Sequence, residues 1–346
     1  MGLNIIKGLK RYYAHFRLKS ELQSLGLDFH LMKFMSFGHQ SFVWSHSCEG
    51  YLLRPNITNS FLFHFISCKH DCAVLKIFIR KIQIICVEKN IITKQLKNGA
   101  SKIGLLAEKR QREKLKYRGF KIAPKLYQVD LQLGFLKEEY IQGKTLYEYI
   151  DRIEDLPDTG FEIFDQLFKV GHIKNQSLNK QYSLYEKKLR SMSKRINNDK
   201  LKKFLDNILR QIRNALHSRP QGSSVMFTDL VHADFNPRNN LIVNSLGDTK
   251  IIDWEHSSSG PVLFDYFYFL TQLNMASARW TEILHQKSKL ILEADQYLGD
   301  QVRICFLHLI VIKLNLWEHK ENLHRRSLSR RIGMLCDINE TIEEYF

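Results

Sequence analysis

The sequence predicts an α+β protein with a small β-rich N-terminal part and a larger helical C-terminal part. Three observations support this fold class. Short runs of β-forming residues follow one another between about residue 38 and residue 140. Beyond Thr145 apolar residues recur at helical spacing, and a single β-rich stretch at 224–254 interrupts these helices. A chain divided in this way is expected to bind its ligand in a cleft.

The composition bounds the class of protein. The 346 residues contain 52 Lys and Arg against 36 Asp and Glu, a formal net charge of +16, and 44% are hydrophobic. This is enough apolar material for a sizeable core, so disorder of the whole chain is excluded. The six cysteines lack the paired spacing of a disulfide framework. No stretch approaches the ~18 apolar residues of a membrane-spanning helix, and we expect a cytoplasmic protein.

Residues 1–37 are predicted to form a basic amphipathic extension. Within residues 1–25 the apolar side chains Ile5, Leu9 and Phe16 recur at helical spacing, with lysines and arginines between them. Such a helix can dock on the body of the protein, or it can lie on an anionic membrane surface. The second alternative places the protein peripherally at the inner face of the membrane, and both stay open.

Residues 38–143 are predicted to form the N-lobe, a β-sheet with one helix. A charged helix over 101–118 ends at Gly119, which stands in the position of a C-terminal cap. The predicted strands are 41–45, 60–67, 72–79, 125–129 and 135–140.

Residues 144–346 are predicted to form a mostly helical C-lobe. Its β-rich stretch contains strands at 224–230, 241–243 and 250–254. The predicted helices are 161–170, 184–192, 200–216, 262–276, 279–298, 301–318 and 322–344.

The most informative string lies in that β-rich stretch. His232-Ala-Asp234-Phe-Asn-Pro-Arg-Asn239-Asn is followed, after a hairpin, by Ile-Asp253-Trp-Glu. Phosphoryl transfer from ATP needs a carboxylate that accepts the proton of the attacking hydroxyl, and oxygen ligands that hold Mg²⁺ on the phosphates. Asp234 is therefore the predicted catalytic base, with Asn239 and Asp253 as metal ligands.

These strings resemble the aminoglycoside phosphotransferase and choline kinase branch of the protein-kinase-like fold, whose members carry His-Gly-Asp-x-x-x-x-Asn and Ile-Asp-Trp/Phe-Glu. The resemblance implies a bilobal fold that binds ATP and Mg²⁺ between its lobes. It also implies structural roles for two residues. Asp265, in Gly-Pro-Val-Leu-Phe-Asp265, would brace the loop, and His232 would bond to backbone near Asp253 rather than act as a general base.

The same resemblance extends to the N-lobe, which it makes a nucleotide-binding sheet. It assigns the phosphate-binding lysine to Lys76, in the strand 72–78, and the partner of that lysine to Glu108 on the charged helix. Glu113 stays open as an alternative partner, because the register of the helix is not determined. The string Glu-Glu139-Tyr140-Ile141-Gln-Gly is similar to the hinge of the family, where the backbone of Glu139, Tyr140 and Ile141 would meet the adenine.

The resemblance implies an ATP-dependent phosphotransferase that moves the γ-phosphoryl group to a hydroxyl of a small molecule, sugar or glycolipid. The charge of +16 disfavours cationic aminoglycosides as acceptors and favours an anionic or membrane-associated acceptor. One alternative is a lipopolysaccharide-type or protein kinase. Another is a pseudokinase that acts as a binding or scaffold module, because residues 54–60 replace the expected Gly-rich loop. No nucleic-acid-binding module is recognised.

Overall fold

The structure is a computed structural model that describes residues 41–44, 50–53, 63–68, 71–77, 81–86, 90–96, 101–196, 198–218, 222–273, 275–292, 298–318 and 325–346. The predicted extension 1–37 lies outside them. The chain divides into two compact units. Unit 1 comprises Met1–Lys109 and Ala123–Gly143, and unit 2 comprises Arg110–Ile122 and Lys144–Phe346. The predicted N-lobe, 38–143, includes residues 110–122, which belong to unit 2.

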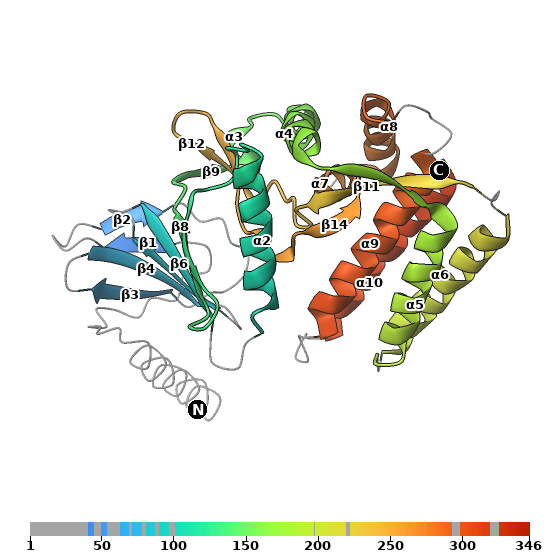
Figure 1. Ribbon diagram of the computed structural model, residues 1–346, viewed down its shortest axis with the longest axis horizontal. Coiled ribbons are helices and arrows are strands. Elements are labelled where there is room, and N and C mark those ends of the chain that lie inside the picture. The colour runs from blue at the N-terminus through green and yellow to red at the C-terminus, as the bar shows by residue number, and fades with distance from the viewer. Residues whose placement is uncertain are drawn as a thin grey trace, which may run out of the picture. The chain divides into compact units, whose positions relative to one another are not determined.

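Unit 1 contains a six-stranded sheet in the order β3-β4-β5-β6-β8-β7, in which every neighbouring pair is antiparallel (Figure 1). A separate hairpin is formed by β1 and β2. The strands are β1 Ser41–Trp44, β2 Gly50–Leu53, β3 Phe63–Cys68, β4 Asp71–Ile77, β5 Lys81–Cys86, β6 Ile91–Leu96, β7 Leu126–Asp130 and β8 Phe135–Glu139.

Two strands of this sheet were not placed by the sequence analysis. Both β5 and β6 lie between β4 and the charged helix, which is α2, Ile103–Tyr117. Both strands are rich in isoleucine, and β-branched residues suit a sheet position with neighbours on both sides. The strand that directly precedes α2 is therefore β6, and β4 is two strands further back.

Helix α2 ends as its sequence predicts. Gly119 has a φ of +72°, a conformation that glycine adopts without a steric penalty. The Gly119 N–H donates to the carbonyl of Lys116 (3.1 Å), and the Phe120 N–H donates to that of Leu115 (2.9 Å). These two bonds form a Schellman cap.

Unit 2 is mainly helical. A three-stranded sheet has the order β10-β11-β14, and a second one has the order β13-β12-β9. The strands are β9 Gly143–Thr145, β10 Ile173–Ser177, β11 Ser224–Val231, β12 Leu241–Asn244, β13 Thr249–Ile251 and β14 Ser258–Pro261. The helices are α3 Leu146–Tyr149, α4 Leu156–Val170, α5 Leu178–Ser193, α6 Asp199–Ser218, α7 Phe264–Thr271, α8 Ser277–Ser288, α9 Leu298–Glu318 and α10 Arg325–Tyr345, with 3₁₀ turns at Ile153–Asp155 and Trp254–His256.

Helix α7 is the centre of the core of unit 2. Every residue from Phe264 to Leu270 is buried, and the helix packs against α4, α8 and α9. Gly160 permits the close approach of α4, because a Cβ atom there would lie 2.3 Å from Cζ of Phe269. The edge-on contact of Phe161 with Tyr266, 5.2 Å between ring centroids, completes the α4 side. The side chains that α7 carries are therefore held rigidly.

Within the described residues, no helix is long and apolar enough to cross a membrane.

Candidate active site

The predicted catalytic loop lies between β11 and β12, in unit 2. Its bend is made at Ala233, which has a φ of +67°. The N–H groups of His232 and Ala233 donate to the two carboxylate oxygens of Asp265, at 2.7 and 2.9 Å. Asp265 is buried, and burial raises its pKa to about 7, while these two hydrogen bonds act in the opposite direction. Asp265 thus braces the loop, which is the contact expected from the sequence.

His232 joins this loop to the segment that carries Asp253. Its Nε2 lies 2.8 Å from the carbonyl oxygen of Ile252, and its Nδ1 accepts from the N–H of Asp234 (3.3 Å). One ring nitrogen therefore donates and the other accepts, as in neutral imidazole. Burial lowers the pKa of His232 to about 4, which agrees with the neutral form. The expected bond to backbone next to Asp253 is present.

Asp234 is half-buried, and both of its carboxylate oxygens have donors. Oδ1 accepts from the hydroxyl of Tyr268 at 2.9 Å, and Oδ2 accepts from Nδ2 of Asn240 at 2.8 Å. Tyr268 lies one helical turn after Asp265 on α7, so both side chains are on the face that meets the loop. The carboxylate is therefore held in one orientation.

The structure distinguishes the two asparagines at the end of the loop. Asn239, the predicted metal ligand, is exposed, whereas its neighbour Asn240 is buried. Nδ2 of Asn240 also donates to the backbone carbonyl of Asp234 (2.8 Å). Both partners are acceptors, so the nitrogen faces them and Oδ1 of Asn240 is the atom left to face a cation. The sequence analysis missed Asn240, although it directly precedes the apolar strand β12.

Asp253 follows β13 with a φ of +63° and a ψ of +63°. The residue before it is held at both backbone groups, because the Ile252 N–H donates to the carbonyl of Asn240 (2.9 Å) and the Ile252 carbonyl accepts from His232. These bonds join the backbone before Asp253 to Asn240. A non-glycine residue in left-handed conformation is uncommon, and such residues concentrate at functional sites.

Unit 1 contains a buried cluster of one lysine and two glutamates. Nζ of Lys94 on β6 lies 2.8 Å from Oε1 of Glu108 on α2 and 2.9 Å from Oε1 of Glu138 on β8. The three side chains are 4%, 1% and 3% exposed. Buried charges of this kind are tolerated only when they are paired, so the cluster is a built feature of the sheet and helix.

This cluster contains Glu108, one of the two predicted partners of the lysine. Glu108 is buried and Glu113 is exposed, so the helix register favours Glu108. The lysine found against Glu108 is Lys94, whereas the sequence analysis chose Lys76. The side chain of Lys76, on β4, lies outside the described side chains. The sequence analysis assigned Lys76 from the resemblance of the strand 72–78, and it predicted no strand at the positions of β5 and β6.

The predicted hinge follows β8. The Glu139 N–H donates to the carbonyl of Lys125 (2.8 Å), and the Tyr140 N–H donates to that of Asn90 (2.9 Å). Both N–H groups are thus used inside unit 1. Ile141 is the remaining residue of the predicted hinge.

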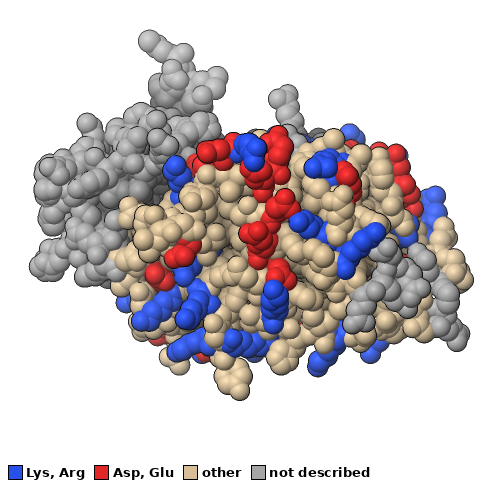
Figure 2. Space-filling view, turned by 90° about the horizontal axis from the view of Figure 1, so that it is seen from above, with Lys and Arg blue, Asp and Glu red and all other residues tan. Residues whose placement is uncertain are grey.

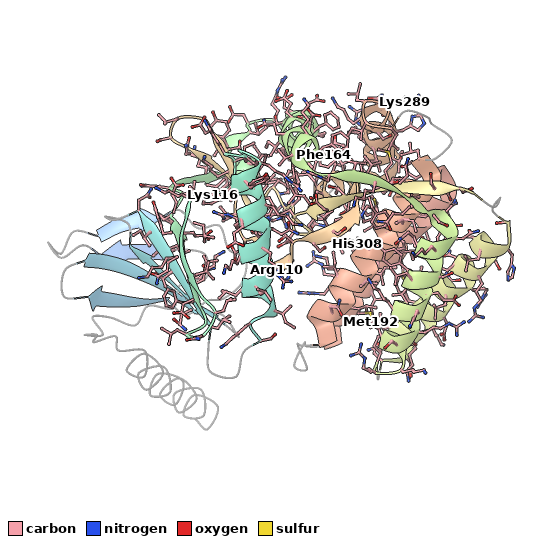
Figure 3. All side chains as sticks on the ribbon, in the orientation of Figure 1. Arg110, Lys116, Phe164, Met192, Lys289 and His308 are labelled. Atoms are coloured by element: carbon pink, nitrogen blue, oxygen red, sulfur yellow. The ribbon has the colours of Figure 1, made fainter. Side chains whose placement is uncertain are left out.

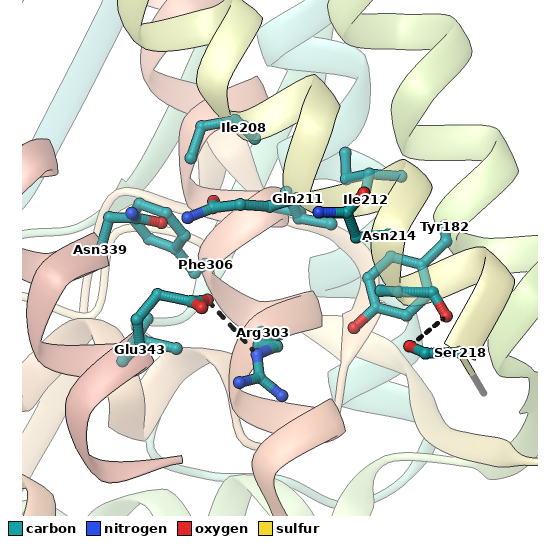
Figure 4. Close-up of a pocket in the computed structure, with 13 residues that line it drawn as sticks. Tyr182, Ile208, Gln211, Ile212, Asn214, Ser218, Arg303, Phe306, Asn339 and Glu343 are labelled. Atoms are coloured by element: carbon teal, nitrogen blue, oxygen red, sulfur yellow. Dashed lines mark hydrogen bonds and ion pairs between the residues drawn. The ribbon is translucent and has the colours of Figure 1, made fainter.

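A pocket of about 290 Å³ lies among α5, α6, α9 and α10 of unit 2 (Figure 4). Its lining includes Arg303 and Glu343, which lie 3.6 Å apart. None of the predicted site residues lines it, so we do not place the chemistry there.

The fold is protein-kinase-like, as the sequence predicts. A family model described as the phosphotransferase enzyme family (APH) matches residues 104–291, more than half of the chain, and the chain belongs to this family. The family expected from the sequence is therefore confirmed.

Solved structures with the same fold include a choline/ethanolamine kinase family protein from Mesorhizobium loti, with a TM-score of 0.52 and 14% identity over 77% of this chain and 86% of that one. Choline kinase LicA from Streptococcus pneumoniae has a TM-score of 0.50 and 15% identity over 96% of this chain and 100% of that one. No curated protein matches the sequence.

Proposed function

We propose that this phosphotransferase moves the γ-phosphoryl group of ATP to a hydroxyl group of a small molecule. The observation that carries the proposal is the half-buried Asp234, fixed by Tyr268 and Asn240 on a loop that Asp265 braces. The acceptor oxygen attacks the γ-phosphorus, the bond from that phosphorus to the β,γ-bridging oxygen breaks, and ADP leaves. Asp234 orients the hydroxyl and takes its proton.

We assign the metal site to Asn240 and Asp253, in place of the predicted pair Asn239 and Asp253. The donor chemistry suits Mg²⁺, which prefers carboxylate and amide oxygens and keeps several waters. Asn240 meets this requirement with Oδ1, because its Nδ2 is bonded to Asp234. When bound, Mg²⁺ neutralises charge on the phosphates.

We assign the nucleotide contacts of unit 1 to Lys94, in place of Lys76, and to the hinge. The pair of Lys94 with Glu108 has the form that kinase-like enzymes use to aim a lysine at the α- and β-phosphates. At the hinge we assign the adenine-facing donor to the N–H of Ile141, since those of Glu139 and Tyr140 are bonded within unit 1.

The acceptors that we favour are anionic or membrane-associated molecules, such as a phosphorylated sugar or a glycolipid, and the family assignment supports phosphotransfer to a small molecule. The untargeted test is to incubate the purified protein with γ-labelled ATP, Mg²⁺ and a metabolite extract of the source organism. Transfer of label to a hydroxyl compound is the expected result. ATP binding without turnover in any extract fraction would support the pseudokinase alternative.

Variants sharpen this test. We expect Asp234→Asn to abolish transfer while ATP and Mg²⁺ still raise the melting temperature. Lys94→Met should raise the KM for ATP by about tenfold or more, and Lys76→Met is its matched control on β4. The reverse ranking of the two lysine variants would contradict our assignment of Lys94.

A further inference from the structure

The hydroxyl of Tyr268 connects the predicted base to a lysine on another helix. It donates to Oδ1 of Asp234 (2.9 Å) and accepts from Nζ of Lys313 on α9 (2.8 Å). Lys313 also lies over the Tyr268 ring, with 4.5 Å between Nζ and the ring centroid. A cation therefore stands two hydrogen bonds from the carboxylate that would receive the acceptor proton.

The tyrosine itself stays neutral. Burial is the main reason why the pKa of Tyr268 lies well above its usual value, and the charge of Asp234 acts in the same direction. The charge of Arg331 on α10 acts on the same hydroxyl with the opposite sign. Positive charge from two helices, α9 and α10, thus reaches this point of the loop.

Lys313 and Asp234 are both half-buried, whereas Tyr268 between them is 2% exposed. Of these three residues, the two charged ones retain more exposed surface than the tyrosine between them. An acceptor hydroxyl placed at Asp234 therefore brings the rest of the acceptor near a positive charge. At such short distances in a partly buried site, one unit charge changes an affinity by an order of magnitude or more.

We propose that Lys313 forms an acceptor subsite for an anionic group, such as a phosphate or carboxylate, carried by the molecule whose hydroxyl is phosphorylated. This inference rests on the proposed function and deepens it. The subsite attracts anionic acceptors and repels cationic ones, so it also excludes alcohols that bear a quaternary ammonium group. The net charge of +16 acts in the same direction over a longer range.

The test uses three small alcohols that differ in charge: glycerol 3-phosphate, glycerol and choline. Transfer of label from ATP to each one is measured as kcat/KM for the full-length protein. Wild type should prefer the anionic probe. Lys313→Met should reduce the ratio of anionic to cationic kcat/KM by about tenfold, and Lys313→Glu by about 100-fold.

The matched control is Lys188→Glu on α5. Lys188 also lies over a tyrosine ring, with 5.6 Å between its Nζ and the ring centroid of Tyr185. The Tyr185 hydroxyl bonds to His308, which is labelled in Figure 3, and not to the loop. Lys188→Glu should keep the wild-type ratio of anionic to cationic kcat/KM, because Lys188 lies over a tyrosine that does not bond to the loop.

Three outcomes would overturn the proposal. Wild type could prefer choline, or the Lys313 variants could lose activity equally on all probes, which would limit Lys313 to supporting Tyr268. The third outcome is that none of the three alcohols accepts the phosphoryl group and none of them slows the background hydrolysis of ATP. Failure of the proposed function differs from all three, because wild type would then neither transfer the phosphoryl group to any compound of the extract nor hydrolyse ATP with Mg²⁺, whether or not it binds ATP.

Discussion

Asn239 and Asn240 are neighbours with the same side chain, and they differ in burial and in their contacts with Asp234. This makes them a matched pair for mutation. We expect Asn240→Ala to lower kcat by about 100-fold, because both the orientation of Asp234 and a metal ligand are lost.

Asn239→Ala should stay within about twofold of wild type, since exposed substitutions away from special features have small effects. The measurement is kcat at saturating ATP over a series of Mg²⁺ concentrations. Loss of activity in Asn239→Ala, with Asn240→Ala active, would assign the metal ligand to Asn239, which stands five residues after Asp234 as the sequence analysis predicts.

This pair illustrates what the sequence can predict of the site. The types and order of the residues in the loop predict roles for His232 and Asp234, the later string that ends in Asp265 predicts the third residue, and the structure brings the three together. A spacing alone cannot tell which of two adjacent asparagines faces inward, because one extra loop residue reverses the answer. Tyr268 was missed for another reason. It stands in a run of aromatic residues, and such a run is typical of core packing, so nothing in the sequence indicates a role for its hydroxyl.

Ala233 holds a backbone conformation that costs an L-residue about 1–2 kcal/mol. Glycine removes this cost, and part of the gain is offset by the greater freedom of glycine in the unfolded chain. We expect Ala233→Gly to raise the free energy of unfolding by about 0.5–1 kcal/mol, measured by denaturant titration.

Ala278 is the control for this substitution. It is exposed in helix α8, where Ala→Gly should lower the free energy of unfolding by about 1 kcal/mol. Destabilisation of similar size at both positions would contradict a strained loop.

At the scale of elements, the second half of α2 is anchored through Asp229 of β11. Both carboxylate oxygens of Asp229 accept from Arg118, at 3.0 and 2.7 Å, and the His172 N–H adds a third bond (2.9 Å). The hydrogen bond from Arg118 is the main cause that holds the pKa of Asp229 far below its usual value, and Lys114 adds to the effect.

This anchor predicts an acid-dependent stability. A lowered pKa in the folded state means that ionised Asp229 favours folding; the contribution is complete above the ordinary aspartate pKa of about 4 and is lost as the pH falls toward the folded-state value. We expect Asp229→Asn to melt below wild type at pH 7, with a gap that narrows toward pH 2. Asp155→Asn, which removes an exposed pair with Arg152, should change little. An equal gap at both pH values would contradict the electrostatic origin.

The elements were predicted unevenly, for physical reasons. Helices α2, α4, α6 and α9 have long periodic patterns, and the structure has them close to the expected ranges. Short strands such as β6, β10 and β14 were missed, because a few residues without clear alternation do not identify a strand without its sheet partners. The missed β6 carries Lys94, which is the lysine that we assign to the nucleotide.

At the scale of the whole molecule, the charge of +16 is not gathered on the face that Figure 2 shows, where acidic and basic side chains of the described residues are interspersed. The excess acts as a general field that attracts anionic ligands and is screened by salt. We expect the KM for ATP to rise severalfold between about 0.05 and 0.5 M salt, with kcat nearly constant. A KM that does not change over this range would limit the effect of charge to the residues in contact with the nucleotide.

The close packing at Gly160 makes this position sensitive to a single mutation. A single methyl group at this position meets the ring of Phe269, so α4 and α7 must move apart. Helix α7 carries Asp265 and Tyr268, which hold the loop, and the disturbance reaches the reaction without any contact to a substrate. One codon change at Gly160 should therefore yield a temperature-sensitive allele, which would allow the enzyme to be switched off in living cells by warming.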